Sequence, residues 1–273
     1  MKKPPPRYLV LGIVALVAVA AAAIATLHGS NTSAKDRIEA DPPPRLFATA
    51  TIRPTEQLVA KQRHQAHTLV TTWLREHGNQ RDDAAFATWV KTAVPKPPPA
   101  ARRDREVEQV QKLAHRRTKA GVTASTWLEK NGKKDLWKLY AHDQAEMLST
   151  KEGETRKADV KAMMKLSKSI ADELGLRYRS SAPYVLHPSL RPDHTVKHGQ
   201  VCPCSYPSRH AAAGAAAATY LGGLEPQRRD LYLWTEGQID YSRIYMAGHV
   251  PSDISAGTLL GDLVGEYYLR TRP

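Results

Sequence analysis

Apolar residues recur at helical spacing along most of this chain, and long runs that alternate apolar with polar residues are absent. Between residues 159 and 174, for example, Val160, Met163, Ser167, Ile170 and Leu174 follow one another at intervals of three or four positions. Residues three or four apart share one face of an α-helix, whereas a half-buried strand requires a period of two. The sequence therefore predicts an all-α fold, a helical bundle.

The first thirty residues contain a long apolar run. Lys2, Lys3 and Arg7 precede an uncharged stretch from Tyr8 to Leu27. Twenty residues of helix span about 30 Å, roughly the hydrocarbon thickness of a bilayer, and basic residues stay on the cytoplasmic side. The run predicts an N-terminal membrane helix at residues 8–27, with the rest of the chain outside the cytoplasm, in the periplasm or cell envelope.

A cleaved signal peptide is the alternative for this run, because Ala23-Ile24-Ala25 resembles a small-residue cleavage site. The protein would then be secreted. An uncleaved anchor is favoured, since the run is longer than the apolar core of most signal peptides.

The remaining chain divides by composition. After residues 1–30, the signal anchor or signal peptide, residues 31–54 contain Pro42-Pro43-Pro44 and are expected to form a linker. Residues 55–150 are expected to be a helical region of uncertain role, in which no spacing demands chemistry, and residues 151–273 the catalytic region. Helices are expected at residues 55–77, 82–93, 104–120 (with Gly121 as its cap), 159–174, 210–221, 226–244 and 252–269. Two further short helices are expected around the aromatic and apolar residues Trp127, Leu128, Leu136, Trp137, Leu139 and Tyr140.

Charge and cysteine content do not decide the function. Lys and Arg outnumber Asp and Glu by 40 to 27, a formal net charge of +13, which suits phosphorylated substrates, acidic lipid headgroups or nucleic acid. A solvated basic surface explains the same excess. Cys202 and Cys204 are one residue apart, which favours two free thiols or a strained bridge over a zinc site, because zinc ligands have wider spacings.

Three short segments in the last third of the chain share one chemistry. They are Arg191-Pro192, then Pro207-Ser208-Arg209-His210, then Ser242-Arg243 with His249 and Asp253. Phosphoryl transfer requires Arg side chains to bind phosphate oxygens and a nucleophile such as neutral imidazole. It also requires a carboxylate that orients the imidazole and a protonated group for the leaving alkoxide. A single His or Arg is more often structural, but the set supplies a residue for every role.

These segments resemble the three-part signature of the superfamily of type 2 phosphatidic acid phosphatases, class A bacterial acid phosphatases and vanadium haloperoxidases. That signature is Lys, six residues, Arg-Pro; Pro-Ser-Gly-His; and Ser-Arg, five residues, His, three residues, Asp. The third part matches in full, the second departs at Arg209, and the first matches at Arg191 and Pro192 with Tyr184 in place of Lys. The resemblance covers about residues 155–269.

The resemblance implies a bundle like the acid phosphatase and vanadium haloperoxidase fold, with the site at one end of the helices and no metal or cofactor. It implies His249 as the nucleophile that forms a phosphohistidine, Asp253 as its orienting partner, and His210 as the proton donor to the leaving group. The phosphate-binding residues that it implies are Arg191, Ser208, Arg209 (through its backbone N–H), Arg243 and, in place of the Lys, Tyr184.

The two departures have physical consequences. A phenol at Tyr184 donates a hydrogen bond but brings no charge. Arg209 replaces a Gly, which costs about 1–2 kcal/mol if that position requires a positive φ. Arg209 would alternatively restore the charge that Tyr184 lacks.

The first hypothesis for the function is an extracytoplasmic acid phosphatase-like enzyme that hydrolyses phosphomonoesters, with a phosphorylated small molecule as substrate. The alternatives are a lipid phosphatase acting on phosphatidate or polyprenyl phosphates at the membrane surface, and a non-catalytic anion-binding envelope protein. One predicted span favours the first, since the lipid phosphatases carry their site on several spans. His210, His249 and Asp253 argue against mere anion binding, and a haloperoxidase is disfavoured by the missing Lys. No nucleic-acid partner is expected, and the sequence leaves the oligomeric state open.

Overall fold

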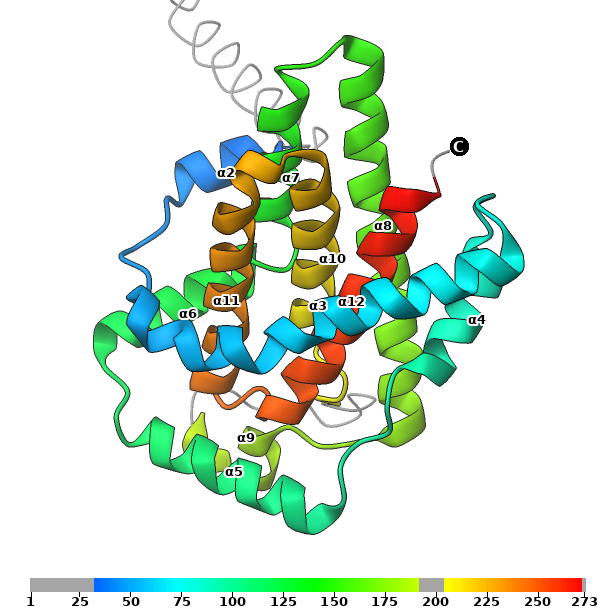
Figure 1. Ribbon diagram of the computed structural model, residues 1–273. Coiled ribbons are helices and arrows are strands. Elements are labelled where there is room, and N and C mark those ends of the chain that lie inside the picture. Colours follow the sequence, from blue (N-terminus) through cyan, green and yellow to red (C-terminus); the bar gives the residue numbers. More distant parts are fainter. Residues whose placement is uncertain (1–31, 192–203, 272–273) are drawn as a thin grey trace, which may run out of the picture.

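The computed structural model describes residues 32–191 and 204–271, which form helices joined by loops (Figure 1). This part of the chain contains no β-strand, only an isolated bridge between Ser181 and Cys204, so the prediction of an all-α fold is confirmed. The helices are α2 (Ala34–Ala40), α3 (Thr49–His77), α4 (Asp83–Ala93), α5 (Ala100–Ala114), α6 (Lys119–Asn131), α7 (Asp135–Ala145), α8 (Thr150–Tyr178), α9 (Pro183–Leu186), the 3₁₀ turns η1 (Pro188–Leu190) and η2 (Pro226–Arg228), α10 (Arg209–Leu224), α11 (Arg229–Tyr245) and α12 (Pro251–Arg270).

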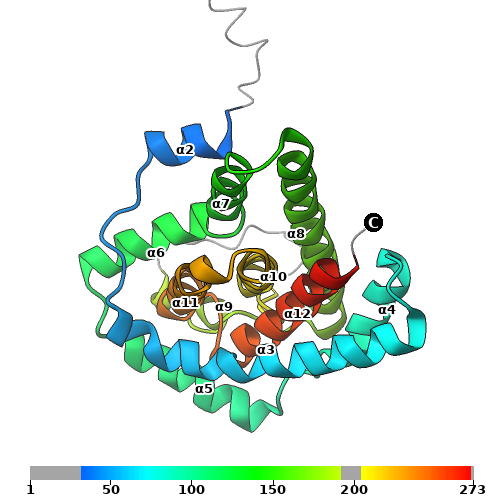
Figure 2. The same ribbon diagram turned by 45° about the horizontal axis from the view of Figure 1, so that its top comes forward.

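Helices α10, α11 and α12 occupy the middle of the molecule, and the other long helices surround them (Figure 2). The backbones of α10 and α12 approach closely because Gly257, Gly261 and Gly265 of α12 face the Ala-rich α10. A Cβ atom on Gly265 would lie 2.6 Å from the carbonyl oxygen of Ala216. The first turns of both helices are thereby joined, and the Ser208 N–H donates to the Asp253 carbonyl at 3.0 Å.

Part of the segment expected as a linker is helical. Ser33 caps α2 with a capping box, and Arg37 donates to the Asp135 carboxylate through Nε at 2.9 Å and Nη2 at 2.7 Å. Helix α3 begins at Thr49, six residues before its expected start. Capping and a half-buried ion pair therefore order residues that their composition alone assigns to a linker.

The helix expected at residues 104–120 is instead two helices, α5 and α6, and the expected cap at Gly121 is wrong. Thr118 caps α6 by accepting a hydrogen bond from the Gly121 N–H. Gly121 lies inside α6, where a Cβ atom would lie 2.7 Å from Cζ of Tyr245. This Gly allows a close helix contact and does not end a helix.

The regions before and after residue 150 share one core. Helix α3 packs along α12 and α11 (Figure 2), and the Phe86 ring of α4 stacks on Tyr267 of α12 with centroids 3.8 Å apart. Arg63 of α3 reaches the buried carboxylates of Glu236, at 2.7 Å, and Asp262, at 3.6 Å. The N-terminal helices therefore complete the fold of the C-terminal ones.

The predicted membrane helix at residues 8–27 lies outside the described residues, as do Pro192 and Cys202. Among the helices that are described, none is both long and apolar enough to cross a bilayer. The anchor stays a prediction. Cys204 is disulfide-bonded.

Candidate active site

The three sequence segments meet at one end of the central helices. Ser208 caps α10, Arg243 lies in the last turn of α11, and Asp253 lies in the first turn of α12. In the loop from α11 to α12, Ala247 adopts a left-handed conformation with φ of 56°. A Cβ atom on Gly248 would lie 3.1 Å from Nη2 of Arg243, so this loop folds tightly over the Arg243 guanidinium.

His249 is held in one tautomer by a backbone carbonyl. Its Nδ1 is 2.8 Å from the carbonyl oxygen of Ser205, and since a carbonyl only accepts, Nδ1 carries the proton. The lone pair of the neutral ring is then on Nε2, which forms no hydrogen bond to the described residues. The Asp253 carboxylate is 3.8 Å from Nδ1, too far for a hydrogen bond but close enough to stabilise a charged imidazolium.

Asp253 is fixed by two donors of its own. Its Oδ2 accepts from the Val250 N–H at 3.0 Å, and its Oδ1 accepts from Nη1 of Arg103 at 2.8 Å. Burial raises the pKa of this carboxyl, but the contact with His249 and the charge of Arg103 outweigh burial, so its pKa lies below the usual 3.8. Asp253 is therefore an anion beside His249.

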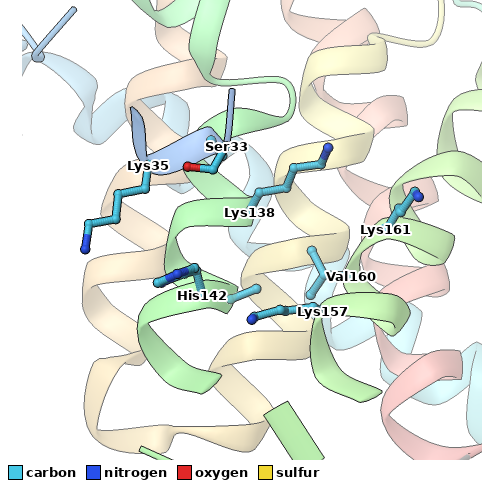
Figure 3. A pocket seen from close by; sticks show the side chains of 9 residues that line it. Ser33, Lys35, Lys138, His142, Lys157, Val160 and Lys161 are labelled. Carbon is cyan, nitrogen blue, oxygen red and sulfur yellow. The ribbon is translucent and has the colours of Figure 1, made fainter. Parts of the chain in front are cut away.

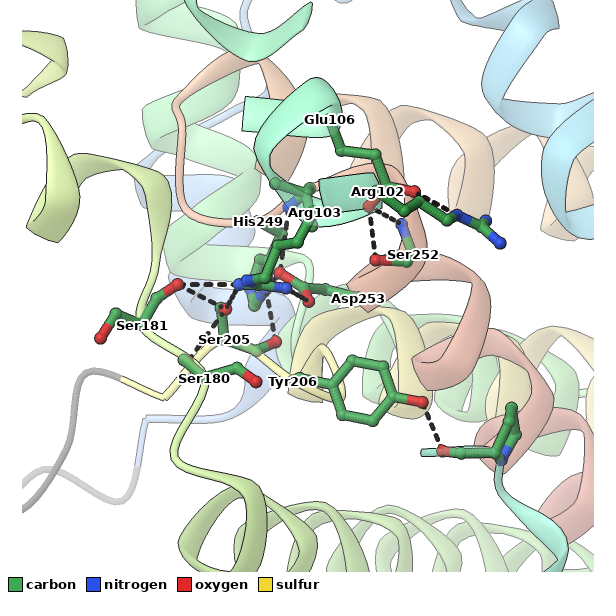
Figure 4. Close-up of polar contacts among 12 residues, drawn as sticks. Arg102, Arg103, Glu106, Ser180, Ser181, Ser205, Tyr206, His249, Ser252 and Asp253 are labelled. Carbon is green, nitrogen blue, oxygen red and sulfur yellow. Dashed lines mark hydrogen bonds and ion pairs between the residues drawn. The ribbon is translucent and has the colours of Figure 1, made fainter. Parts of the chain in front are cut away.

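Arg103 of α5 ties the site together (Figure 4). Besides Asp253, its guanidinium donates through Nη2 to the Ser181 carbonyl and to the Ser205 hydroxyl, both at 2.8 Å. One side chain thus links α5 to α12 and to the loop whose carbonyl orients His249. Glu106, one turn further along α5, accepts from the Ser252 hydroxyl at 2.5 Å, which pins the start of α12 a second time.

Arg191 and Arg243 converge on one carboxylate. Glu129 of α6 lies 3.3 Å from Nη2 of Arg191 and 3.0 Å from Nη2 of Arg243. Burial raises the pKa of Glu129, but the charges of Arg243 and Arg191 outweigh it and lower the pKa to about 2. Both Arg side chains are buried, and Nε of Arg191 and Nε and Nη1 of Arg243 have no hydrogen-bond partner among the described residues.

Tyr184 lies beside these cations. The guanidinium carbon of Arg191 is 5.7 Å from the centroid of the Tyr184 ring, and the Tyr184 N–H donates to the Ala247 carbonyl at 3.2 Å. Burial raises the pKa of the phenol, so the group stays neutral. Tyr184 therefore faces the site.

Arg209 is not brought to the other arginines. Its side chain is exposed and its Nη1 is 3.0 Å from the Asp172 carboxylate of α8. Arg209 therefore forms an ion pair on the outer surface, away from Arg191 and Arg243. Its φ is not positive, because it is the first residue of α10, and the expected strain does not arise. Ser208 is fully buried, and its hydroxyl accepts from the Ala211 N–H at 3.3 Å.

His210 reaches back toward α6. Its Nε2 is 3.1 Å from the Glu129 carbonyl, so Nε2 carries a proton. Burial, with the neighbouring charge of Arg243, lowers the pKa of His210 well below 6.5, and His249 contributes to the same shift. The two His rings therefore belong to one site, with His210 neutral at neutral pH in the free protein. Among the described residues, no group of His, Cys, Asp and Glu is arranged to hold a metal ion.

This arrangement of a tautomer-locked His, a buried carboxylate and paired arginines can be set against known proteins. Residues 177–272 match the PAP2 superfamily. The match confirms the resemblance to the type 2 phosphatidic acid phosphatase superfamily and supports phosphatase activity on phosphorylated substrates. The PAP2 match begins at the end of α8 and extends past α12. No curated protein gave a significant match to the chain.

Sequence reasoning missed Arg103 and Glu129. Both lie in residues 55–150, for which only packing was expected, and both precede the PAP2 match. No local spacing marks them, because α5 and α6 come to the site only through tertiary packing. The one available signal was the excess of Arg over acidic residues in the motifs, which requires a compensating carboxylate once the arginines are buried.

Proposed function

We propose that this protein is an extracytoplasmic phosphatase that hydrolyses phosphomonoesters through a phosphohistidine on His249, without a metal. The observation that carries the proposal is the pair of buried arginines, Arg191 and Arg243, whose free N–H donors surround a single carboxylate. Buried donors without partners are rare in folded proteins. A phosphate monoester offers more oxygens and more charge than Glu129, and would satisfy the donors that Glu129 leaves unpaired.

The tautomer of His249, with its proton on Nδ1, assigns the attacking atom of the proposed reaction. The lone pair of His249 Nε2 attacks phosphorus, the bond to the ester oxygen breaks, and the leaving alkoxide takes a proton from His210. Asp253 stabilises the positive charge that develops on the His249 ring. Water then attacks phosphorus and gives its proton to His210, the P–N bond breaks, and inorganic phosphate leaves. Preorganised Arg donors stabilise the charge on the transferring group throughout.

The proposed location rests on the N-terminal sequence. The uncharged run from Tyr8 to Leu27 places the site outside the cytoplasm and near a membrane in this proposal. A lipid phosphatase acting at the membrane surface is the second candidate, because the run would hold the site near the bilayer; a single span nevertheless favours the first candidate, since the lipid phosphatases carry their site on several spans.

Substitution of His249 tests the proposal. In the purified full chain, His249→Ala should reduce release of nitrophenolate from p-nitrophenyl phosphate to background, because no other group can form the covalent intermediate. The exposed His64 of α3 supplies a matched control, His64→Ala, which should keep wild-type turnover. Wild type quenched in alkali during turnover should carry one acid-labile phosphoryl group on His249. Undiminished turnover by His249→Ala, or inhibition of wild type by chelators, would refute the mechanism.

A further inference from the structure

One surface of the molecule gathers basic side chains that the candidate site does not use. This basic face is formed by α2, by α7 with the residues just before it, by one side of α8 and by the first turns of α10. Two adjoining hollows of about 220 and 200 Å³ lie on it and share Lys138 and Lys161. Its basic residues are Lys35, Lys133, Lys134, Lys138, Lys157, Lys161, Lys165, Lys168 and Arg209.

Helical spacing puts these charges side by side. On α8, Lys157, Lys161, Lys165 and Lys168 follow at intervals of four, four and three residues, so they form one row. On the adjacent α7, Lys138 projects toward that row. Figure 3 shows Lys35, Lys138, Lys157 and Lys161, from three different helices, around one hollow. Tertiary packing thus turns a general excess of Lys into a local positive field.

Most of this charge is not neutralised within the molecule. Asp172 pairs with Lys168 and Arg209, and Glu154 pairs with Lys157. Five other lysines of the basic face form no salt bridge with the described residues; they are Lys133, Lys134, Lys138, Lys161 and Lys165. Burial lowers the pKa of Lys133, and the neighbouring charges of Arg209 and Lys168 lower it further. An external anion would relieve this repulsion.

The floor of the basic face is apolar. Ala141 and Val160 line one hollow, and Met164 and Ala213 line the other. Lys stems lie along such surfaces while their ammonium groups reach outward. A surface of this kind suits the boundary between lipid headgroups and acyl chains, where apolar and anionic groups occur together.

The position of α2 fixes how far this face can be from a membrane. Ala34, the first residue of α2, follows the end of the uncharged run at Leu27 by seven residues. Seven residues span at most about 25 Å when fully extended. If the run crosses a bilayer, the α2 edge of the basic face is tethered within that distance of the headgroups.

We propose that the basic face docks the protein on a bilayer surface rich in anionic phospholipids. The contact is separate from the predicted membrane helix and from the catalytic residues. It orients α2, α7 and α8 toward the lipid, with α3 and α5 on the opposite side of the molecule (Figure 2).

Lysine footprinting of the full chain tests the proposal without relying on enzyme activity. The full chain is incorporated into vesicles of phosphatidylcholine alone, or of phosphatidylcholine with roughly 30% phosphatidylglycerol, whose negative surface potential attracts Lys side chains. Its lysines are then acylated briefly, and the modified residues are identified by mass spectrometry. Lys138, Lys161 and Lys165 should react several-fold more slowly in the anionic vesicles, and 0.5 M salt, which shortens the Debye length to about 4 Å, should remove the difference. The exposed Lys61 of α3 and Lys112 of α5 should react alike in both.

Charge reversal supplies the matched comparison. Lys134→Glu with Lys161→Glu should abolish the protection of Lys138 and Lys165, whereas Lys61→Glu with Lys112→Glu changes the net charge equally and should leave it intact; thermal unfolding verifies that both variants fold. Equal reactivity in the two lipids, or loss of protection in both double variants, overturns the proposal. Stronger protection by single-stranded nucleic acid than by anionic vesicles also overturns it, in favour of a nucleic-acid partner.

Discussion

In the free protein, the Glu129 carboxylate partly neutralises the charges of Arg191 and Arg243 at the candidate site. The two arginines that a phosphate would bind are held by the Glu129 carboxylate at 3.3 and 3.0 Å. Because the pKa of Glu129 is lowered to about 2, this carboxylate is ionised at any pH at which the protein would work. A phosphate must therefore compete with an anion that is already part of the chain.

Removing that anion should strengthen phosphate binding. Glu129→Gln keeps the shape and a hydrogen-bond acceptor but loses the charge, so inorganic phosphate and vanadate should inhibit about tenfold more tightly, the equivalent of about 1.4 kcal/mol. The measurement is the inhibition constant against p-nitrophenyl phosphate. The exposed Glu108 of α5 provides the control Glu108→Gln. Unchanged or weaker inhibition of Glu129→Gln would mean that Glu129 organises the arginines and does not compete with the ligand.

The low pKa of His210 sets the expected pH dependence. His210 must be protonated to act as the acid, and burial together with Arg243 lowers its pKa well below 6.5. For an alkyl phosphate, kcat/KM should fall about tenfold per pH unit above that pKa, which places the optimum well below neutrality. The fall should be shallower for p-nitrophenyl phosphate, whose leaving group needs no proton. A rate for the alkyl ester that still rises at pH 9 would contradict the assignment.

The same shift affects stability in a known direction. The unfolded chain protonates this His near pH 6.5, whereas the folded protein keeps it neutral to lower pH. The unfolded state therefore binds more protons in that window, and stability from His210 is lost as the pH falls below about 6.5.

At the scale of helices, the contact between α10 and α12 positions the site. The Gly residues of α12 allow the two backbones to touch, and that contact brings the cap at Ser208 to the first turn of α12, where Asp253 lies. Small residues at every fourth position are thus a requirement of the site, although none of them contacts the reacting groups.

Adding one methyl group to that contact should separate the helices. In Gly261→Ala the new Cβ would be 2.8 Å from Cβ of Ala215 and 2.8 Å from N of Ala216, and such overpacking costs about 1–3 kcal/mol. The melting temperature should fall by several degrees, with loss of turnover. Gly214→Ala in α10 is the matched control, because its nearest contact is 3.6 Å from the Trp137 ring, and Ala is the better helix former. A melting temperature for Gly261→Ala at or above that of Gly214→Ala would refute this account.

Helix existence was predictable from the sequence, while helix ends and helix neighbours were not. Apolar spacing located α3, α4, α8, α10, α11 and α12, because buried faces repeat every 3.6 residues. Apolar spacing failed between residues 104 and 121, because the charged residues continue through the break between α5 and α6 and the N-cap at Thr118 is not apparent. It also failed at α2, which is held in place by the contact of Arg37 with the distant Asp135. Local sequence does not encode which helices touch. Gly121 was therefore predicted to cap a helix, whereas it lies inside α6 and leaves room for the Tyr245 ring of α11.

For the molecule as a whole, the candidate site is larger than its sequence signature. The signature supplied His249, His210, Asp253, Arg191, Ser208 and Arg243, because their order and spacing are specific. It did not supply Arg103, which is 150 residues from its partner Asp253, or Glu129. The PAP2 match likewise begins at residue 177, so it omits every helix from α2 to α7.

The C-terminal region alone should therefore fail to fold. Its core contains three fully buried carboxylates, Glu236, Asp240 and Asp262, whose pKa values are all raised because they are buried near one another. The cation that faces them is Arg63 of α3, which residues 151–273 lack. An uncompensated buried charge costs about 3–5 kcal/mol, a large share of the 5–15 kcal/mol of a typical domain, and the loss of α3 also uncovers one side of α12.

Near-UV circular dichroism during heating measures whether the full chain and the fragment 151–273 unfold cooperatively. The full chain should unfold in one cooperative transition, and the fragment 151–273 should show neither a cooperative transition nor turnover, although it contains every residue of the signature. The variant Arg63→Met in the full chain separates the two causes, because it removes the cation and keeps α3: it should lower the melting temperature yet retain one transition. A fragment that unfolds cooperatively would show that the C-terminal helices form an independent domain and that α3, α5 and α6 were added to a site already complete.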